Sequence, residues 1–270
     1  MEEITSAQNP VIKLVRSLSS RKHRESLGLF AVEGPEYALK AKAHGYEPHL
    51  LLVDRAQRAG RGVGEILAWA RKERARTVAV PPALMFRLSG LNNPQPLILL
   101  CRQRFAKSFE GNLPADALVL ALDRIRDPGN LGTIMRTAEA SGVTRLCLIA
   151  DTCDPYSPEA LRASAGSLFA MDVLRCSHDE ALAMMASWPG DTIATERVAG
   201  EDFRQRYLRP ALLLMGSESE GLHIALRDGA SKRVRIPMAP GVESLNLATA
   251  TALMLYELQL PRISERHGLT

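Results

Sequence analysis

The chain has 270 residues, and its proportions of 46% hydrophobic and 24% charged residues are those of a globular protein. Its net charge of +4 is uneven, because residues 1–105 hold 17 basic against 9 acidic side chains, whereas residues 106–270 hold 17 against 21. No apolar run approaches the roughly 20 residues that cross a bilayer, and the acidic start lacks the basic and apolar regions of a signal peptide. We therefore expect a cytoplasmic protein with no membrane partner.

The first half of the chain predicts a small α/β domain. Asn9 is a suitable N-cap for a helix whose first residue is Pro10, and apolar side chains then recur at helical spacing. After this helix, strands and helices alternate. The expected strands are 29–32, 49–53, 77–80 and 97–101, and the further helices are 35–43 and 63–76.

Basic side chains are concentrated in and just after the opening helix. They are Lys13, Arg16, Arg21, Lys22 and Arg24. A basic surface of this kind is typical of contact with a polyanion, but charged side chains that are merely solvated would leave the same pattern. Charge alone leaves these alternatives open.

The second half predicts a parallel sheet, after a linker expected at 106–116, where charge, Gly and Pro mix without periodicity. Its apolar strands are nearly continuous, which is typical of a doubly wound sheet covered on both faces. The expected strands are 117–122, 145–150, 171–174, 192–194, 211–215 and 233–236, and the helices are 132–141, 158–169, 179–187 and 249–258. We therefore predict domains at 1–105 and 117–270.

The four cysteines form no recognisable metal or disulfide motif. Cys101, Cys147, Cys153 and Cys176 include no CxxC pair, and no histidine lies at zinc-finger spacing from any of them. We therefore expect reduced thiols and no bound metal.

Ligands of an open parallel sheet bind beyond the carboxyl ends of its strands. The first candidate segment there is DRIRDPGNLGTIMRT, where a turn opens a helix and could hold an anion, unless Asn130 is simply the N-cap. The second is GSESEGL, whose acids could meet a ligand or only stabilise the next helix. The third is IPMAPGVESLNLA, whose extended backbone could pair with an adenine edge, unless Ser244 and Asn246 merely cap a helix.

Other nucleotide-binding and hydrolytic motifs are missing from the sequence. No GxGxxG follows a strand, and there is neither a GxxxxGK[ST] loop nor a GxSxG elbow. The six histidines lie outside the three segments. A dinucleotide-binding fold, a P-loop and a Ser–His hydrolase are therefore disfavoured.

In this order and at these spacings, the three segments closely resemble the three motifs of the SpoU-type RNA ribose methyltransferases of the SPOUT class. The stretch RASAG at 162–166 supports the match, and residues 6–34 resemble the L30e-like substrate-binding domain of many members. The resemblance implies an α/β fold whose C-terminal parallel sheet carries a deep trefoil knot, which periodicity cannot indicate. It also implies a homodimer through the C-terminal domain, with the last helix as the candidate surface, although that helix could instead be buried within one subunit.

The resemblance further implies S-adenosyl-L-methionine as the cofactor and a ribose 2'-hydroxyl as the methyl acceptor. The implied cofactor-binding positions are Gly216, Ile236, Met238 and Leu245, and the implied catalytic set is Asn130, Arg136, Glu218, Ser244 and Asn246. A guanidinium has a pKa above about 12 and no acceptor atom. We therefore expect Arg136 to act electrostatically and not as a base.

The two-domain layout of the resemblance favours ribosomal RNA, and 23S rRNA in particular, as the substrate. The five basic residues of the opening segment would then contact RNA phosphates, which orient an RNA but specify little sequence. The alternatives are a tRNA ribose 2'-O-methyltransferase and a non-catalytic RNA-binding or ribosome-assembly protein on the same fold.

Overall fold

A computed structural model describes residues 1–89, 92–109 and 113–267. The chain forms two compact units, of which the first comprises Met1–Arg104 and Asp154–Phe169 and the second comprises Phe105–Cys153 and Ala170–Thr270. Within the described ranges, the helices are all too short or too polar to cross a membrane.

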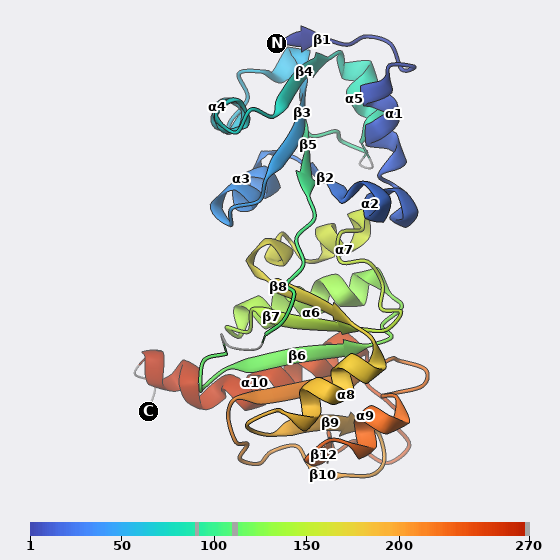
Figure 1. Ribbon diagram of the computed structural model, residues 1–270, viewed down its shortest axis with the longest axis vertical. Helices are drawn as coiled ribbons and strands as arrows, with labels where there is room; N and C mark the ends of the chain where they lie inside the picture. Colours follow the sequence, from blue (N-terminus) through green and yellow to red (C-terminus); the bar gives the residue numbers. More distant parts are fainter. Residues whose placement is uncertain (90–91, 110–112, 268–270) are drawn as a thin grey trace. The chain divides into compact units, whose positions relative to one another are not determined.

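The first unit is built on a mixed five-stranded sheet. Its strands are Glu2–Glu3 (β1), Leu29–Glu33 (β2), Pro48–Asp54 (β3), Arg76–Val80 (β4) and Leu97–Arg102 (β5), and its helices are Pro10–Ser17 (α1), Arg21–Leu27 (α2), Pro35–Ala43 (α3), Arg55–Gln57 (η1), Val63–Lys72 (α4), Pro82–Leu88 (α5) and Pro158–Ala163 (α7). The strand order is β1-β4-β3-β5-β2, with β5 antiparallel to both neighbours (Figure 1). Apolar side chains of α1 and α5, such as Ile12 and Met85, pack on the sheet face of Leu52 and Val78.

The expected elements of the first half are confirmed, but α4 is shorter than expected, and β1, α2 and α5 were not expected as separate elements. Asn9 caps α1 as predicted, because its side chain accepts a hydrogen bond from the Val11 amide (2.9 Å). Helix α4 ends at Lys72, and Arg74 takes a left-handed conformation (φ 58°) beyond it. Helix α5 was missed, because Pro82 was expected to begin a turn, whereas proline also suits the first position of a helix.

A segment from the second half of the sequence completes the first unit. The Tyr156 ring is fully buried against Phe30 (ring centroids 4.5 Å apart), and its hydroxyl donates to the Arg104 carbonyl (2.6 Å). The Lys40 ammonium donates to the Ala165 carbonyl (2.7 Å). The predicted domains are contiguous in sequence, whereas the compact units are not, because residues 154–169 lie in the first.

Arg24 differs from the other basic residues of the opening segment. Its Nε donates to Asp154 (2.7 Å), and the two side chains are only 4% and 2% exposed. Its Nη1 donates to the carbonyls of Leu18 and Ser19. A guanidinium enclosed in this way cannot reach an RNA phosphate, so the expectation that Arg24 contacts RNA is corrected, and we assign it the task of holding the 154–169 segment.

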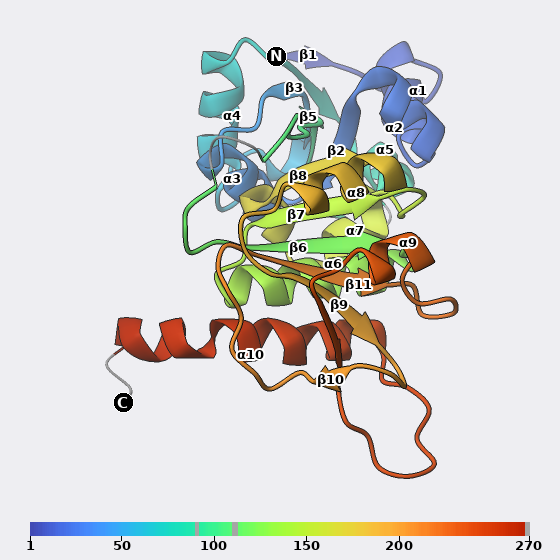
Figure 2. The ribbon, with the colours of Figure 1, turned by 60° about the horizontal axis from the view of Figure 1, so that its bottom comes forward.

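The second unit is a seven-stranded, all-parallel sheet, which confirms the predicted fold class. Its strands are Leu118–Asp123 (β6), Arg145–Ile149 (β7), Asp172–Cys176 (β8), Thr192–Glu196 (β9), Glu201–Asp202 (β10), Ala211–Gly216 (β11) and Lys232–Arg235 (β12), and its helices are Pro128–Ala140 (α6), His178–Ala186 (α8), Ile224–Asp228 (α9) and Leu247–His267 (α10). The strand order is β10-β12-β9-β11-β6-β7-β8. Helices α8 and α9 cover one face, and α6 and α10 lie together on the other (Figure 2). The trefoil knot stays a prediction.

Two segments differ from what the sequence indicated: the expected linker packs against the second unit, and one expected helix is interrupted. In the expected linker, of which residues 110–112 lie outside the described part, the Ala106 amide donates to the Val173 carbonyl (2.7 Å) and Phe109 is buried. The helix expected at 158–169 is instead α7 followed by the 3-10 turn Ser167–Ala170 (η2). The break lies at Ala165 and Gly166, which both have positive φ.

Replacing Arg24 by Met is expected to destabilise the protein by about 3–5 kcal/mol, because Asp154 would remain buried without its charged partner. The matched control is Arg21→Met, whose exposed ion pair with Glu25 is worth less than about 1 kcal/mol. Urea titration gives the free energy of unfolding of both variants. Equal losses would contradict the structural role of the buried pair.

Candidate functional site

The loops of the second unit begin at one edge of its sheet. Strands β6 and β11 pair in parallel with Asp123 opposite Gly216, so that both strands end at the same level. Strand β9 lies on the other side of β11, and β12 lies next to β9. The segments that follow β6, β11 and β12 are the three that the sequence singled out, and the sheet therefore brings them together.

A line of three side chains joins these three loops. Asp127, not Asn130, caps α6, because its side chain accepts the Asn130 amide (2.5 Å). The Asn130 side chain is thereby left to donate from Nδ2 to Glu218 Oε1 (2.7 Å). Asn246 donates from Nδ2 to Asn130 Oδ1 (3.1 Å). Asn130 therefore links an acid of the second loop to an amide of the third.

Asn246 makes two kinds of contact: it caps the last helix, which is one of the alternatives that the sequence left open, and it also reaches Asn130. Its Oδ1 accepts from the backbone amides of Ala248 and Thr249 (2.9 and 3.3 Å), which lie in the first turn of α10. Because that oxygen faces the helix, the amide nitrogen must face Asn130. Capping the helix thus sets the orientation of the side chain in the site.

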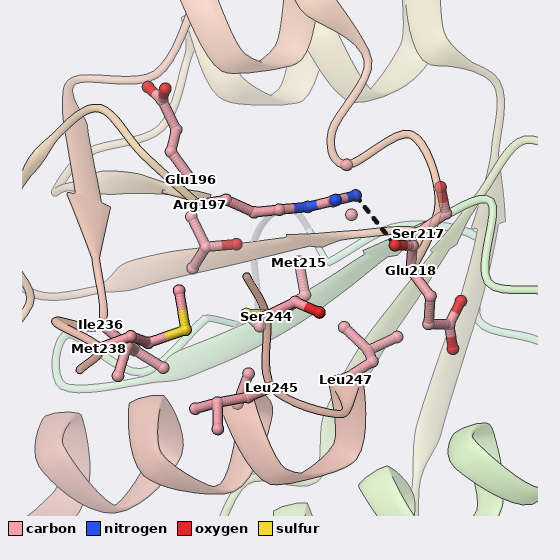
Figure 3. Close-up of a pocket in the computed structure, with 14 residues that line it drawn as sticks. Glu196, Arg197, Met215, Ser217, Glu218, Ile236, Met238, Ser244, Leu245 and Leu247 are labelled. Atoms are coloured by element: carbon pink, nitrogen blue, oxygen red, sulfur yellow. Dashed lines mark hydrogen bonds between the residues drawn. The ribbon is translucent and has the colours of Figure 1, made fainter. Parts of the chain in front are cut away.

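A pocket lies beside this line, at the ends of β9, β11 and β12 (Figure 3). The predicted residues that line it are Gly216, Glu218, Ile236, Met238, Ser244 and Leu245. Residues that sequence analysis missed also line it, among them Thr195, Glu196, Arg197, Met215, Ser217 and Leu247. Its wall is therefore mostly apolar side chain and loop backbone, with Glu218 at one end.

Gly216 is required where the second loop turns back on its own strand. A Cβ atom placed there would lie 2.1 Å from the Gly221 carbonyl carbon and from the Leu222 amide nitrogen. Real Cβ atoms do not approach backbone so closely, so any other residue would displace the loop.

Arg197 is the most informative of the missed residues. It follows β9, where no motif drew attention, yet its Nη2 donates to the carbonyl of Glu218 (2.9 Å) (Figure 3) and to that of Ser219 (2.8 Å). The signal that could have found it is position, because β9 ends beside β11 at the same edge of the sheet.

Arg136 and Ser244 are the predicted catalytic residues that do not belong to this line. Arg136 is the more distant in the sequence from its members. It lies six residues beyond Asn130 on α6, about 240° further round the helix, and its side chain is exposed. Within the part of the chain that the structure describes, it forms no hydrogen bond or ion pair with the other site residues. Ser244 is also exposed, but it lines the pocket.

The predicted RNA-binding residues of the first unit other than Arg24 are exposed. Lys13 and Arg16 lie on α1, and Arg21 and Lys22 begin α2. Arg21 also forms an ion pair with Glu25 one turn away (3.0 Å).

Comparison with known proteins places the chain in a family. Residues 117–256 match the model of the SpoU rRNA methylase family, and residues 9–99 match that of the MRM3-like substrate-binding domain. The chain belongs to the SpoU rRNA methylase family, and the resemblance drawn from its motifs is confirmed.

Relatives match the chain along nearly its whole length. An uncharacterised tRNA/rRNA methyltransferase of Synechocystis is 34% identical and covers 94% of this chain and 92% of its own. The 23S rRNA (uridine(2479)-2'-O)-methyltransferase of Streptomyces viridochromogenes is 32% identical, over 94% and 90%. A solved AdoMet-bound rRNA methyltransferase of Sinorhizobium meliloti is 33% identical and superposes with a TM-score of 0.89, over 96% of this chain and 98% of that one.

Gly216→Ala and Gly64→Ala are expected to change stability in opposite directions. The Cβ at Gly216 would overlap backbone and cost about 1–3 kcal/mol. The Cβ at Gly64, in the first turn of α4, meets nothing within 4 Å and should stabilise the helix by about 0.4–1 kcal/mol. Denaturant midpoints measure both, and a Gly216→Ala protein as stable as wild type would contradict the close approach.

Proposed function

We propose that the protein transfers the methyl group of S-adenosyl-L-methionine to a ribose 2'-hydroxyl of ribosomal RNA, with 23S rRNA as the substrate. The observation that carries the proposal is the line Glu218–Asn130–Asn246 beside an apolar pocket. Three polar side chains from separate loops meet there, next to a space suited to a nucleoside. The solved relative that carries AdoMet supports the choice of cofactor.

The pocket residues fit this cofactor. Met215, Ile236, Met238 and Leu247 offer apolar surface to an adenine ring, and the extended backbone of 236–246 offers hydrogen-bonding groups to its edge. The Glu218 carboxylate can face the positive charge of a sulfonium. Gly216 contributes backbone to the wall of the pocket.

Bound S-adenosylmethionine supplies an electrophilic methyl group. The residues of the chain must then hold a ribose oxygen in line with it and help to remove its proton. We assign Asn130 and Asn246 to orienting the ribose, because their mutual hydrogen bond fixes both amides. Glu218, whose Oε1 accepts from Asn130, uses its other oxygen to position the hydroxyl or a water, and the hydroxyl proton passes to water.

Arg136 acts, in this proposal, by binding the phosphate next to the acceptor ribose. Its exposed position on α6 leaves the guanidinium accessible to RNA. A fixed positive charge there would stabilise the negative charge that develops on the 2'-oxygen. Ser244, also exposed beside the pocket, would bind a neighbouring hydroxyl or phosphate.

The proposal includes a homodimer and a cytoplasmic location. Leu253 and Tyr256, one turn apart on α10, are 42% and 43% exposed, which suits a face that a second copy covers. Equilibrium sedimentation measures the mass of the particle in solution directly. A monomer at all protein concentrations would contradict the proposed homodimer. The cytoplasmic location follows from the proposed substrate, which is ribosomal RNA in the cytoplasm.

Arg136→Ala is expected to lower kcat about 10²–10³-fold and to leave cofactor affinity unchanged, because a charge that acts on the transition state is lost. The measurement is transfer from methyl-labelled cofactor into ribosomal RNA and tRNA, with 2'-O-methylation shown by alkali-resistant dinucleotides. Glu139→Ala, exposed on the same helix, is the control and should match wild type. Label in tRNA alone would overturn the proposed substrate. Label in neither RNA would overturn the proposed activity.

The triple variant Lys13→Gln, Arg16→Gln, Lys22→Gln is expected to weaken RNA binding. It should also reduce the slope of log affinity against log salt by roughly two to three, as each lost phosphate contact removes part of the counterion release. A second triple variant that neutralises Arg58, Arg71 and Lys72, exposed elsewhere in the same unit, removes the same charge. Filter binding across salt concentrations compares the RNA affinities of the two triple variants. Equal effects would show that the basic residues of the opening segment are an ordinary solvated surface.

A further inference from the structure

A buried carboxylate lies at the end of β6, outside the pocket. The Asp123 side chain is fully buried and meets three groups. Its Oδ1 lies 2.8 Å from His178 Nε2 and accepts from Arg124 Nε (3.1 Å), and its Oδ2 accepts from the His223 backbone amide (2.7 Å). Asp123 is therefore tied both to its own loop and to the residue that ends the second loop.

Arg124 extends this connection into the second loop. Its Nη2 donates to the Gly221 carbonyl (3.1 Å), and its Nη1 pairs with Glu220. Its backbone is left-handed (φ 56°), a conformation that a non-glycine residue keeps only where surrounding contacts hold it. The hydrogen bond to Asp123 raises the pKa of its guanidinium above the ordinary value.

Two histidines close the cluster on its other side. His178 begins α8 and stacks on His223, with ring centroids 4.3 Å apart and planes at 22°. His223 is the N-cap of α9, and its Nδ1 accepts from the Ala225 amide (3.3 Å). The starts of two helices are thus fixed relative to Asp123.

These contacts converge on the Gly216–His223 segment. Asp123 and Arg124 hold its end, and Arg197 holds the Glu218 and Ser219 carbonyls from the pocket side. The side chain of Glu218, whose carbonyl Arg197 holds, accepts a hydrogen bond from Asn130. Neither Asp123, Arg124 nor His178 lines the pocket itself.

We propose that Asp123, Arg124 and His178 are positioning residues, which hold the Gly216–His223 segment in the shape that lines the cofactor pocket and presents Glu218 to Asn130. The inference rests on the proposed function, because its value to the protein is the alignment of cofactor and ribose. It assigns these residues no contact with either substrate.

The deciding comparison is Arg124→Gln against Arg126→Gln. Arg126 stands two residues further along the same loop, and its ion pair with Asp151 is exposed on both sides. Calorimetry should show that Arg124→Gln binds S-adenosylmethionine about tenfold more weakly, because the Gly221 carbonyl loses its partner and the buried Asp123 carboxylate loses one of its three. Its kcat should fall while its KM for RNA stays that of wild type, and Arg126→Gln should match wild type in all three quantities.

A pair of substitutions at His178 separates positioning from folding. His178→Gln keeps a group that can donate to Asp123 and should retain wild-type cofactor affinity. His178→Leu should bind the cofactor about tenfold more weakly, because the buried Oδ1 of Asp123 loses one of its two partners. If the Arg124→Gln protein does not fold, the two His178 variants still test the inference. Arg124→Gln or His178→Leu proteins with wild-type affinity and kcat would overturn the inference, even if their melting temperatures fall. Wild-type protein that does not bind the cofactor would instead overturn the proposed function.

Discussion

The in-register parallel pairing of β6 and β11 is the constraint on which the site depends. Asp123 stands opposite Gly216 in that ladder, so the first and second loops start from adjacent residues at one level. A shift of one residue would turn the side chains of a strand to the opposite face. The contact between Asn130 and Glu218, the turn at Gly216 and the ties from Asp123 all assume this register.

The chain achieves much of the site geometry with groups that also hold the fold together. Asn246 caps α10 and orients Asn130 with the same amide. Asp127 caps α6 and so leaves the Asn130 side chain available to Glu218. Asn130 and Asn246, with Glu218 bonded to Asn130, are therefore held by groups that cap helices before any ligand binds, which is the preorganisation that catalysis of this kind requires.

Local sequence patterns predicted most of the fold, because apolar runs bounded by Gly, Pro and capping residues report short-range structure. They missed α5, whose opening proline suits a turn equally well, and the two-residue strand β1, whose pairing lies far along the chain. They also could not predict that Arg24 is buried, because its partner Asp154 lies 130 residues away. Long-range pairs of this kind leave no periodic signal.

The site was predicted where a motif could be recognised and missed where only the sheet brings residues together. The resemblance indicated Asn130, Glu218 and Asn246, which the structure joins, but it did not indicate Arg197, whose strand carries no motif. Arg136 is the reverse case, a motif residue that lies exposed and apart from that line.

The measurement that tests the central claim most directly is a crystal structure with S-adenosylhomocysteine, the cofactor after methyl transfer. The account predicts the nucleoside in the pocket that Met238 and Leu247 line, and a nucleoside bound only in the separate cavity beside Phe109 and Trp188 would contradict it.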